Sequence, residues 1–271
     1  MDPLYLLEIV LVVTVLSLLA LRLRILDSRG TALASFVGFL VYLGFGRVGL
    51  VTLASFVIVA GLATKLGYGA KKMKGGAEPR KGLRGWRNVA GNGLIAAAIA
   101  TVCIALQQYE GLLLASFIGA VAAVFGDTMA TEIGLLSRAK PRSIIGFNTV
   151  EPGTPGGVTL LGYIGAVSSG VVLSGVATLL THTNPLDRSV ALYSALGGAL
   201  IGTTVDSVVG QLFQAVYRCE KCGAVTEHKM HCGGEARFVR GHRSVGNQSV
   251  NLVASIAGAL WGLTIAAYLS G

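Results

Sequence analysis

Apolar and polar positions divide the chain into eight apolar stretches separated by polar gaps. A helix needs about 20 apolar residues, at about 1.5 Å each, to cross the hydrocarbon core of a bilayer. The stretches do not alternate apolar and polar residues as half-buried β-strands do. The pattern predicts an all-α, polytopic bundle of about eight spans, and the shortness of the second stretch leaves seven to nine open. The predicted spans cover residues 4–21, 31–45, 48–64, 89–107, 111–126, 157–180, 190–214 and 249–269.

The composition agrees with a membrane protein. Of the 271 residues, 53% are hydrophobic and only 13% are charged, which is too few polar residues to cover a soluble globule. The first stretch has no basic segment before it and no small-residue cleavage site after it, so we expect a retained helix instead of a signal peptide. We interpret residues 1–271 as a single integral membrane domain.

The basic residues are distributed unevenly between alternate gaps. The net charge is +9, and all but two of the 22 Lys and Arg residues, Arg47 and Arg188, fall into one set of gaps. Because cytoplasmic loops carry an excess of basic residues, we predict that loops 65–88, 137–156 and 215–248 face the cytoplasm and that both termini lie outside the cell membrane. The charge suits anionic lipid or a polyphosphate. No nucleic-acid partner is expected, since the charge is spread over short loops.

Three carboxylates lie in stretches that otherwise look like membrane spans. Asp127 and Glu132 lie in LLLASFIGAVAAVFGDTMATEIGLL, which continues past the span 111–126, and Asp206 lies in the span 190–214. A charged residue in the bilayer costs about 2.5 kcal/mol or more, so it usually faces the bundle interior, has a partner and serves a function. Asp127 and Asp206 both come late in their spans, near the predicted cytoplasmic end. Glu132 lies about 140° around a regular helix from Asp127. Either the helix bends or ends near Gly126 or Gly134, or one of the two acids pairs with a basic loop residue.

Further polar groups reach the same depth from other spans. Asparagines begin the fourth and eighth spans, and the glycine-rich segment EPGTPGGVTLLG, residues 151–162, opens the sixth. Mg²⁺ binds carboxylates together with substrate phosphates, and backbone N–H groups before a helix attract phosphate oxygens. We predict Asp127, Glu132 and Asp206 as catalytic Mg²⁺ ligands, although the asparagines could merely cap helices and the glycines merely form a turn. The predicted nucleotide and phosphate ligands are Asn88, Asn92, Gly153, Thr154, Gly156, Gly157, Asn247 and Asn251.

A basic, glycine-containing loop at residues 65–88 belongs to the same predicted face. Such charge clusters are often only solvated. The glycines would let this loop close over phosphates, where its cations would stabilise developing charge and exclude water. The predicted phosphate-binding lysines are Lys65, Lys71 and Lys72, and the predicted catalytic arginines are Arg84 and Arg87.

Three of the four cysteines gather in the last cytoplasmic loop. The segments CEKCG and HCGG resemble the turns of a zinc knuckle, in which backbone N–H groups point at thiolate sulfur. An odd number of cysteines in a reducing compartment has no disulfide solution. We predict a small structural zinc knuckle, with His228 as the alternative to His231, and we expect Cys103 in the core. The predicted Zn²⁺ ligands are Cys219, Cys222, His231 and Cys232.

Four motifs in a fixed order carry a family resemblance: GDTMATEIG, EPGTPGGVTLLG, GTTVDSVVGQLFQ and GNQSVNLVASIAGA. Together they resemble a family of integral membrane proteins that includes the plant phytyl-phosphate kinase of tocopherol synthesis, over residues 61–259. Gly126, Met129 and Thr131 replace the alanine, tryptophan and serine that are usual there. The resemblance implies phosphoryl transfer from a nucleoside triphosphate, CTP or ATP, to a phytyl- or geranylgeranyl-type monophosphate, which becomes the diphosphate.

The residues and the resemblance together predict a membrane-embedded lipid kinase. Its partners would be the nucleotide, the prenyl monophosphate and membrane lipids, and a homo-oligomer is left open. Two other classes remain: an ion-coupled transporter, with carboxylates at a broken-helix site, and a cytidylyltransferase that forms a CDP-lipid. The product discriminates among them, since only the kinase yields a lipid diphosphate and a nucleoside diphosphate.

Overall fold

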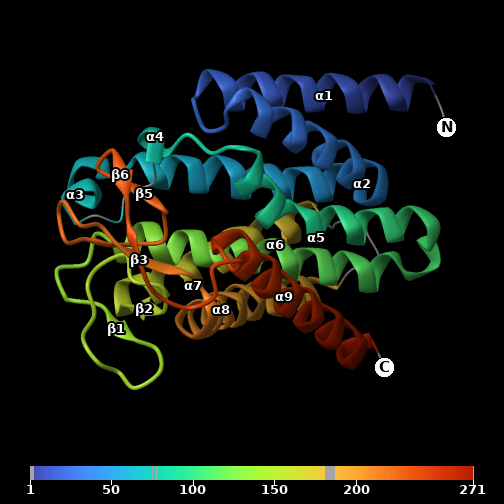
Figure 1. The fold of residues 1–271 in the computed structure, drawn as a ribbon. Helices are drawn as coiled ribbons and strands as arrows, with labels where there is room; N and C mark the ends of the chain where they lie inside the picture. Colours follow the sequence, from blue (N-terminus) through green and yellow to red (C-terminus); the bar gives the residue numbers. More distant parts are fainter. Residues whose placement is uncertain (1–2, 75, 77–78, 181–186, 271) are drawn as a thin grey trace.

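The computed structural model describes residues 3–74, 76, 79–180 and 187–270. Long helices form a bundle, and short strands at one end of it (Figure 1) form a small cap. The cap comprises the strands within residues 142–158 and 216–240. Among the described residues, seven helices are long and apolar enough to cross a membrane, which confirms the predicted helical class. They are α1 (Pro3–Arg22), α2 (Ser28–Lys65), α5 (Trp86–Ala105), α6 (Glu110–Gly134), α7 (Leu160–Leu180), α8 (Arg188–Phe213) and α9 (Asn247–Ser270).

Helix α2 contains two membrane spans. It breaks at Gly46, whose φ of 58° lies in the left-handed region that glycine adopts without strain. Lys65, at its last residue, donates a hydrogen bond to the carbonyl of Leu23, just before its first turn. Both ends of α2 therefore lie at the same level, and its halves run antiparallel. Counted this way, the described helices make eight crossings, as the apolar pattern predicted.

Helix α6 occupies the centre of the bundle. It packs against α2, α5, α7, α8 and α9, and every residue from Leu114 to Gly126 is buried. Glycines allow the closest approach, because a Cβ on Gly119 would lie 2.1 Å from the carbonyl oxygen of Gly258 in α9. A Cβ on Gly198 in α8 would lie 2.7 Å from the Gly119 oxygen. Small residues therefore allow close helix packing on both of these neighbours of α6.

The boundaries of α6 differ from the predicted span. Its apolar pattern stops at residue 126, but the helix continues to Gly134. Asp127 and Glu132 consequently lie within one helix, and neither a bend nor an end separates them. In the basic segment 65–88, α3 (Tyr68–Met73) and the short turn α4 (Pro79–Gly82) are formed, while residues 75, 77 and 78 lie outside the described part. A short 3₁₀ turn, η1 (Gln107–Tyr109), joins α5 to α6.

The strands, which the sequence pattern did not indicate, are each two to four residues long. Strands β1 and β2 pair antiparallel, a three-stranded sheet has the order β4-β3-β7, and β5 and β6 form a separate hairpin. All lie at the same end of the bundle (Figure 1). Segments this short carry too few alternating positions to be recognised from sequence. They are β1 (Arg142–Ser143), β2 (Gly157–Val158), β3 (Val216–Arg218), β4 (Val225–Thr226), β5 (Met230–His231), β6 (Gly234–Glu235) and β7 (Arg237–Arg240).

A buried ion pair attaches α3 to the bundle. The Nζ atom of Lys71 lies 2.6 Å from Oε2 of Glu132 in α6 and also donates to the carbonyl oxygen of Ala63 at 2.6 Å. Lys71 is 0% exposed and Glu132 is 3% exposed. Removing one partner of such a pair leaves an uncompensated charge away from water, which is costly.

Lys71→Met should therefore destabilise the protein by about 3 kcal/mol or more, seen as a lower unfolding temperature of the detergent-solubilised protein. Lys72→Met, at the neighbouring exposed lysine, is the matched control and should leave the unfolding temperature unchanged. A double variant, Lys71→Met with Glu132→Leu, should recover part of the loss, because it removes both charges of the pair and leaves only Arg84, 3.8 Å from Glu132, without its acidic neighbour. Wild-type melting of Lys71→Met would contradict the structural role of the pair.

Candidate functional site

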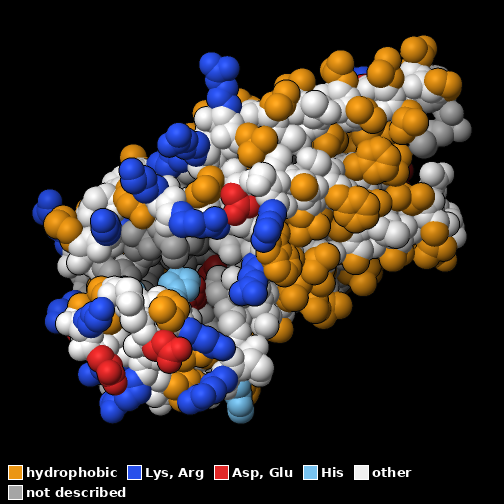
Figure 2. All heavy atoms as spheres, turned by 45° about the horizontal axis from the view of Figure 1, so that its top comes forward, with side chains coloured by type: hydrophobic (Ala, Val, Ile, Leu, Met, Phe, Trp, Pro, Cys, Tyr) orange, Lys and Arg blue, Asp and Glu red, His pale blue; other side chains and the backbone are white. Residues whose placement is uncertain are grey.

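A large polar cavity opens at the end of the bundle that carries the strands. Its volume is about 1000 Å³, and its walls come from the ends of α5, α6, α8 and α9, the segment 152–159 and the strand-containing cap. Figure 2 shows a hollow with acidic side chains inside it and a histidine beside it. Lys and Arg side chains surround this end, whereas hydrophobic side chains cover the flank beyond it (Figure 2).

Asp127 of α6 and Asp206 of α8 meet in this cavity. Both line it, and their carboxyl groups are hydrogen-bond neighbours. Asp206 is buried, with 9% of its surface exposed. The structure thus brings together the two acids for which the sequence predicted a common depth.

Carboxamides from α5 and α9 hold Asp206 in place. With its nitrogen turned toward the carboxylate, the Asn251 side chain lies 3.0 Å from Oδ2 of Asp206 and 2.5 Å from the Asn92 side chain. One turn closer to the cap, Gln248 donates to Asn88 at 3.4 Å. The asparagines of α5 therefore pair with α9 side chains, and Gly85 occupies the N-cap of α5 without a side-chain bond. Asn247, the first residue of α9, also lines the cavity.

Glu132 has a different environment from Asp127. One carboxylate oxygen binds Lys71, and the other lies 3.8 Å from Nη2 of Arg84. This geometry corresponds to the expected alternative, in which one acid of α6 pairs with basic loop residues. A role for Glu132 as a Mg²⁺ ligand stays a prediction, and its two cationic neighbours already balance its charge.

A further acid of the cavity, Glu227, was not anticipated from the sequence. It follows β4 in the cap, lines the cavity and lies within electrostatic range of both Asp127 and Asp206. Gln214, at the C-cap of α8, donates a hydrogen bond of 2.7 Å to it. Its sequence neighbours belong to the cysteine cluster and gave no sign of this position. Only the folding of the cap over the bundle brings Glu227 to the site.

This donor set fits a divalent cation. Carboxylates that share a site repel one another unless a proton or a cation lies between them, and Mg²⁺ prefers such oxygen ligands. Asp127 and Asp206 would hold it, with room left in the cavity for phosphate oxygens. Within the described ranges, no group of three carboxylates reaches metal-ligand spacing by itself.

The predicted basic ligands separate into two groups. Lys72 and Arg84 line the cavity, together with Arg138 and Lys140 from the loop after α6. Three others lie elsewhere: Lys71 in the buried pair, Lys65 on the Leu23 carbonyl, and Arg87 over the Trp86 ring at 5.5 Å.

The glycine-rich segment forms a firm wall of the cavity. Gly153 and Gly156 both have a φ of 80°, and a Cβ on Gly156 would lie 2.4 Å from the side chain of Gln211 in α8. The N–H groups of Thr154 and Gly157 donate to carbonyls within the turn. Those two N–H groups are therefore already used, while phosphate binding at Gly153 and Gly156 stays a prediction.

The four predicted zinc ligands form one cluster at the rim of the cavity. The ligand atoms of Cys219, Cys222, His231 and Cys232 lie within 4.8 Å of one another, and Nδ1 of His231 lies 3.3 Å from the Cys232 sulfur. His228 instead lies 3.8 Å from Glu227. A hydrogen bond from the Cys222 backbone N–H, and to a smaller extent one from the His231 side chain, lowers the pKa of Cys219 to about 6. A lower pKa favours the thiolate, which is the form that binds metals. This cluster could hold a metal ion, and its Cys3His composition suits structural zinc.

The purified wild-type protein should carry one zinc ion per chain; His231→Ala should lose it, whereas His228→Ala should retain it. Because such a metal would join the two turns of the cap, its loss should also lower the unfolding temperature. Elemental analysis and thermal denaturation measure both effects. Equal zinc content in the two variants, or no zinc in the wild type, would refute the assignment.

A family model described as "Integral membrane protein DUF92" matches residues 11–259. An uncharacterised membrane protein of Methanocaldococcus jannaschii is 31% identical over 94% of this chain and 92% of its own length. Protein PGR of Arabidopsis thaliana is 30% identical over 91% of this chain and 92% of its own length.

Protein VTE6, chloroplastic, also of Arabidopsis thaliana, is 26% identical over 70% of this chain and 56% of its own length. No solved structure matches significantly. The helical bundle and a family match over most of the sequence agree with one another. This chain belongs to the DUF92 family of integral membrane proteins.

Proposed function

We propose that the protein is a membrane-embedded prenyl-phosphate kinase, which transfers a phosphoryl group from CTP or ATP to an isoprenoid alcohol monophosphate. The observation that carries this proposal is the pair of carboxylates, Asp127 and Asp206, in a polar cavity surrounded by Lys and Arg at one end of a membrane bundle. The resemblance to the phytyl-phosphate kinase family and the similarity to Protein VTE6 support it.

The chemistry of the acceptor suits this cavity. A phosphate monoester has a second pKa of about 6, so its oxygens are already ionised at neutral pH and no strong general base is required. The remaining task is to align two anions and neutralise their charge. A cavity with acids for a metal ion on one side and cations on the other meets that need.

Each side chain then has a distinct task. Asp127 and Asp206 would hold Mg²⁺, which when bound neutralises the nucleotide phosphates. Asn251, braced by Asn92, orients Asp206. Arg84 binds the acceptor phosphate, and the cations of the loop after α6 attract the nucleotide.

Purified protein should convert a prenyl monophosphate and CTP or ATP into the prenyl diphosphate and a nucleoside diphosphate. Asp127→Asn or Asp206→Asn should slow this by about a hundredfold or more, the scale of losing one preorganised electrostatic group. Asp187→Asn is the matched control, since Asp187 caps the other end of the same helix as Asp206 and asparagine caps equally well, so its rate should stay within about twofold.

Near-normal turnover by Asp127→Asn or Asp206→Asn, with Asp187→Asn also unaffected, would remove these acids from the mechanism. A CDP-lipid with pyrophosphate would identify a cytidylyltransferase instead, and transport without nucleotide turnover would identify a transporter. Glu227→Gln should lower the rate less than Asp206→Asn does, because Glu227 lies in the cap and influences the two aspartates only through its charge.

We also propose that the cavity faces the cytoplasm, where nucleotides are available and where the basic loops are expected. In intact cells, a membrane-impermeant maleimide should label Gln108→Cys, because η1 lies at the opposite end of the bundle from the cap. The unsubstituted chain is the control, since Cys219, Cys222 and Cys232 lie in the cap and Cys103 is buried. Labelling of Gln108→Cys only after permeabilisation would reverse the orientation.

A further inference from the structure

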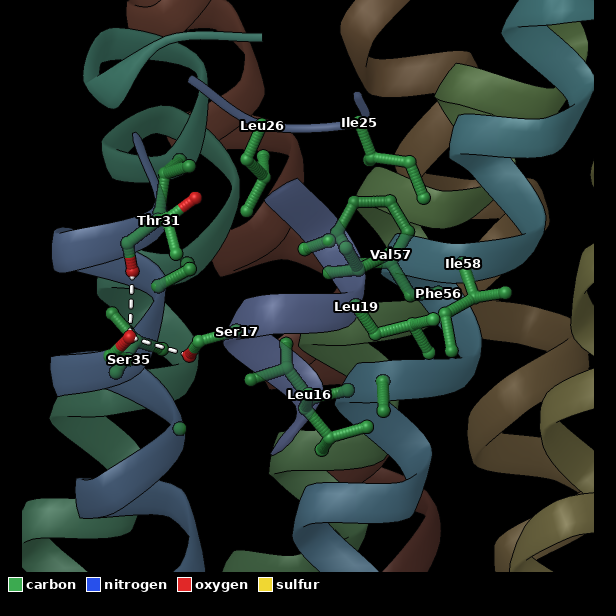
Figure 3. Close-up of a pocket in the computed structure, with 18 of the residues that line it drawn as sticks. Leu16, Ser17, Leu19, Ile25, Leu26, Thr31, Ser35, Phe56, Val57 and Ile58 are labelled. Carbon is green, nitrogen blue, oxygen red and sulfur yellow. Dashed lines mark hydrogen bonds between the residues drawn. The ribbon is translucent and has the colours of Figure 1, made fainter. Parts of the chain in front are cut away.

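A second cavity lies between α1 and the two halves of α2. Its volume is about 110 Å³, roughly a tenth of the polar cavity. Figure 3 shows Leu16 and Leu19 of α1 beside Phe56, Val57 and Ile58 from the second half of α2. We call this space the apolar groove.

The apolar groove adjoins the polar cavity. Arg84, Asn88 and Asn92 line both. A molecule with a charged head and an apolar tail could therefore place the head in one and the tail in the other. Neither cavity alone would accommodate both parts.

Polar atoms within the groove are mostly satisfied by one another. The hydroxyls of Ser17 and Ser35 lie 2.7 Å apart, and Ser35 donates to the Thr31 carbonyl at 2.8 Å (Figure 3). These hydroxyls already have hydrogen-bond partners and need none from a ligand. Along this stretch the groove is therefore suited to a hydrocarbon chain.

The junction with the polar cavity has the opposite character. Arg84 is only 8% exposed, yet among the described residues its Nε atom has no hydrogen-bond partner. Thr31 Oγ1 is likewise buried without a partner in the described part of the chain. Leaving a buried donor unsatisfied is costly, and more so when it is charged. An anionic group of a ligand would satisfy Arg84 and place its charge where the groove ends.

The groove lies at the margin of the bundle. Among the long helices α1 packs chiefly against α2, and its outer face exposes large apolar residues such as Leu11 and Leu18, each 60% exposed. This location contrasts with α6, which the other helices surround. A molecule dissolved in the bilayer can reach the groove sideways, without crossing the protein.

We propose that the apolar groove holds the single hydrocarbon chain of a lipid monophosphate, with its phosphate at Arg84. The groove is small, at about 110 Å³, so we expect it to accept one hydrocarbon chain. A prenyl tail meets this limit, whereas the two chains of a diacyl lipid do not. The identity of the lipid as acceptor rests on the proposed function, whereas binding in the groove requires no turnover.

The test is photolabelling of the purified full chain with a 20-carbon prenyl monophosphate that carries a diazirine near the end of its tail. Labelled peptides should come from α1 and α2. Ala34→Phe, which fills the groove, should reduce this labelling by about tenfold or more, equivalent to about 1.4 kcal/mol. Ala32→Phe, on the same helix but exposed, is the matched control and should label like the wild type.

If Ala34→Phe fails to fold, Ala54→Phe fills the groove from the other half of α2. Labelling that is unchanged in a folded groove-filling variant, or that falls outside α1 and α2, would overturn the proposal. Equal labelling of the groove by the corresponding prenyl alcohol would refute the role of Arg84, and equal labelling by a diacyl phosphatidate probe would refute the single-chain assignment.

The same variants separate this inference from the proposed function. Groove labelling without phosphoryl transfer from any nucleotide would refute the kinase and leave the lipid site standing. Full phosphoryl transfer to the 20-carbon acceptor by Ala34→Phe would refute the groove and leave the kinase standing.

Discussion

The complete enclosure of α6 by five other helices is the constraint on which the site depends. From Leu114 to Gly126 this helix has no lipid-facing side, so its neighbours must approach closely at every level, which the glycines of α8 and α9 permit. A polar side chain at the end of such a helix cannot turn toward the bilayer. It can face only another helix, a loop or an internal cavity, and the two acids of α6 do so in different ways.

Asp127 and Glu132 have different surroundings because they lie at different positions around the same helix. They are about 140° apart on a regular helix. Asp127 faces α8 and meets Asp206 in the polar cavity, whereas Glu132 faces Lys71 and Arg84. Sequence motifs present the two as a pair, but in the bundle one remains available to a ligand while the other anchors α3. The Glu132 pair also fixes the basic segment close to the cavity.

Local patterns were sufficient for the spans and for the grouping of the four predicted zinc ligands. Hydropathy located both halves of α2 because lipid exposure acts on each segment separately, and the CEKCG and HCGG turns already contain their own ligands. The Lys71–Glu132 pair, the position of Glu227 and the apolar groove depend on how distant segments pack. No residue spacing indicates that a lysine in α3 reaches α6 or that an acid in the cap reaches α8. A charged residue within an apolar stretch is the one sequence signal that pointed toward such contacts, because such a residue usually has a partner elsewhere in the bundle.

The break at Gly46 has a consequence for the biosynthesis of the protein. Each half of α2 satisfies its backbone internally, so the two can enter the bilayer together as a helical hairpin before α6 has been made. At its tip the hairpin carries Arg47, a charge that is costly to place in the bilayer without a partner. Arg47 lies 2.8 Å from Glu8 near the start of α1, and the Tyr42 hydroxyl donates to the same carboxylate. The first three crossings thus contain the counter-ion of Arg47, and no later segment is needed to pair this charge.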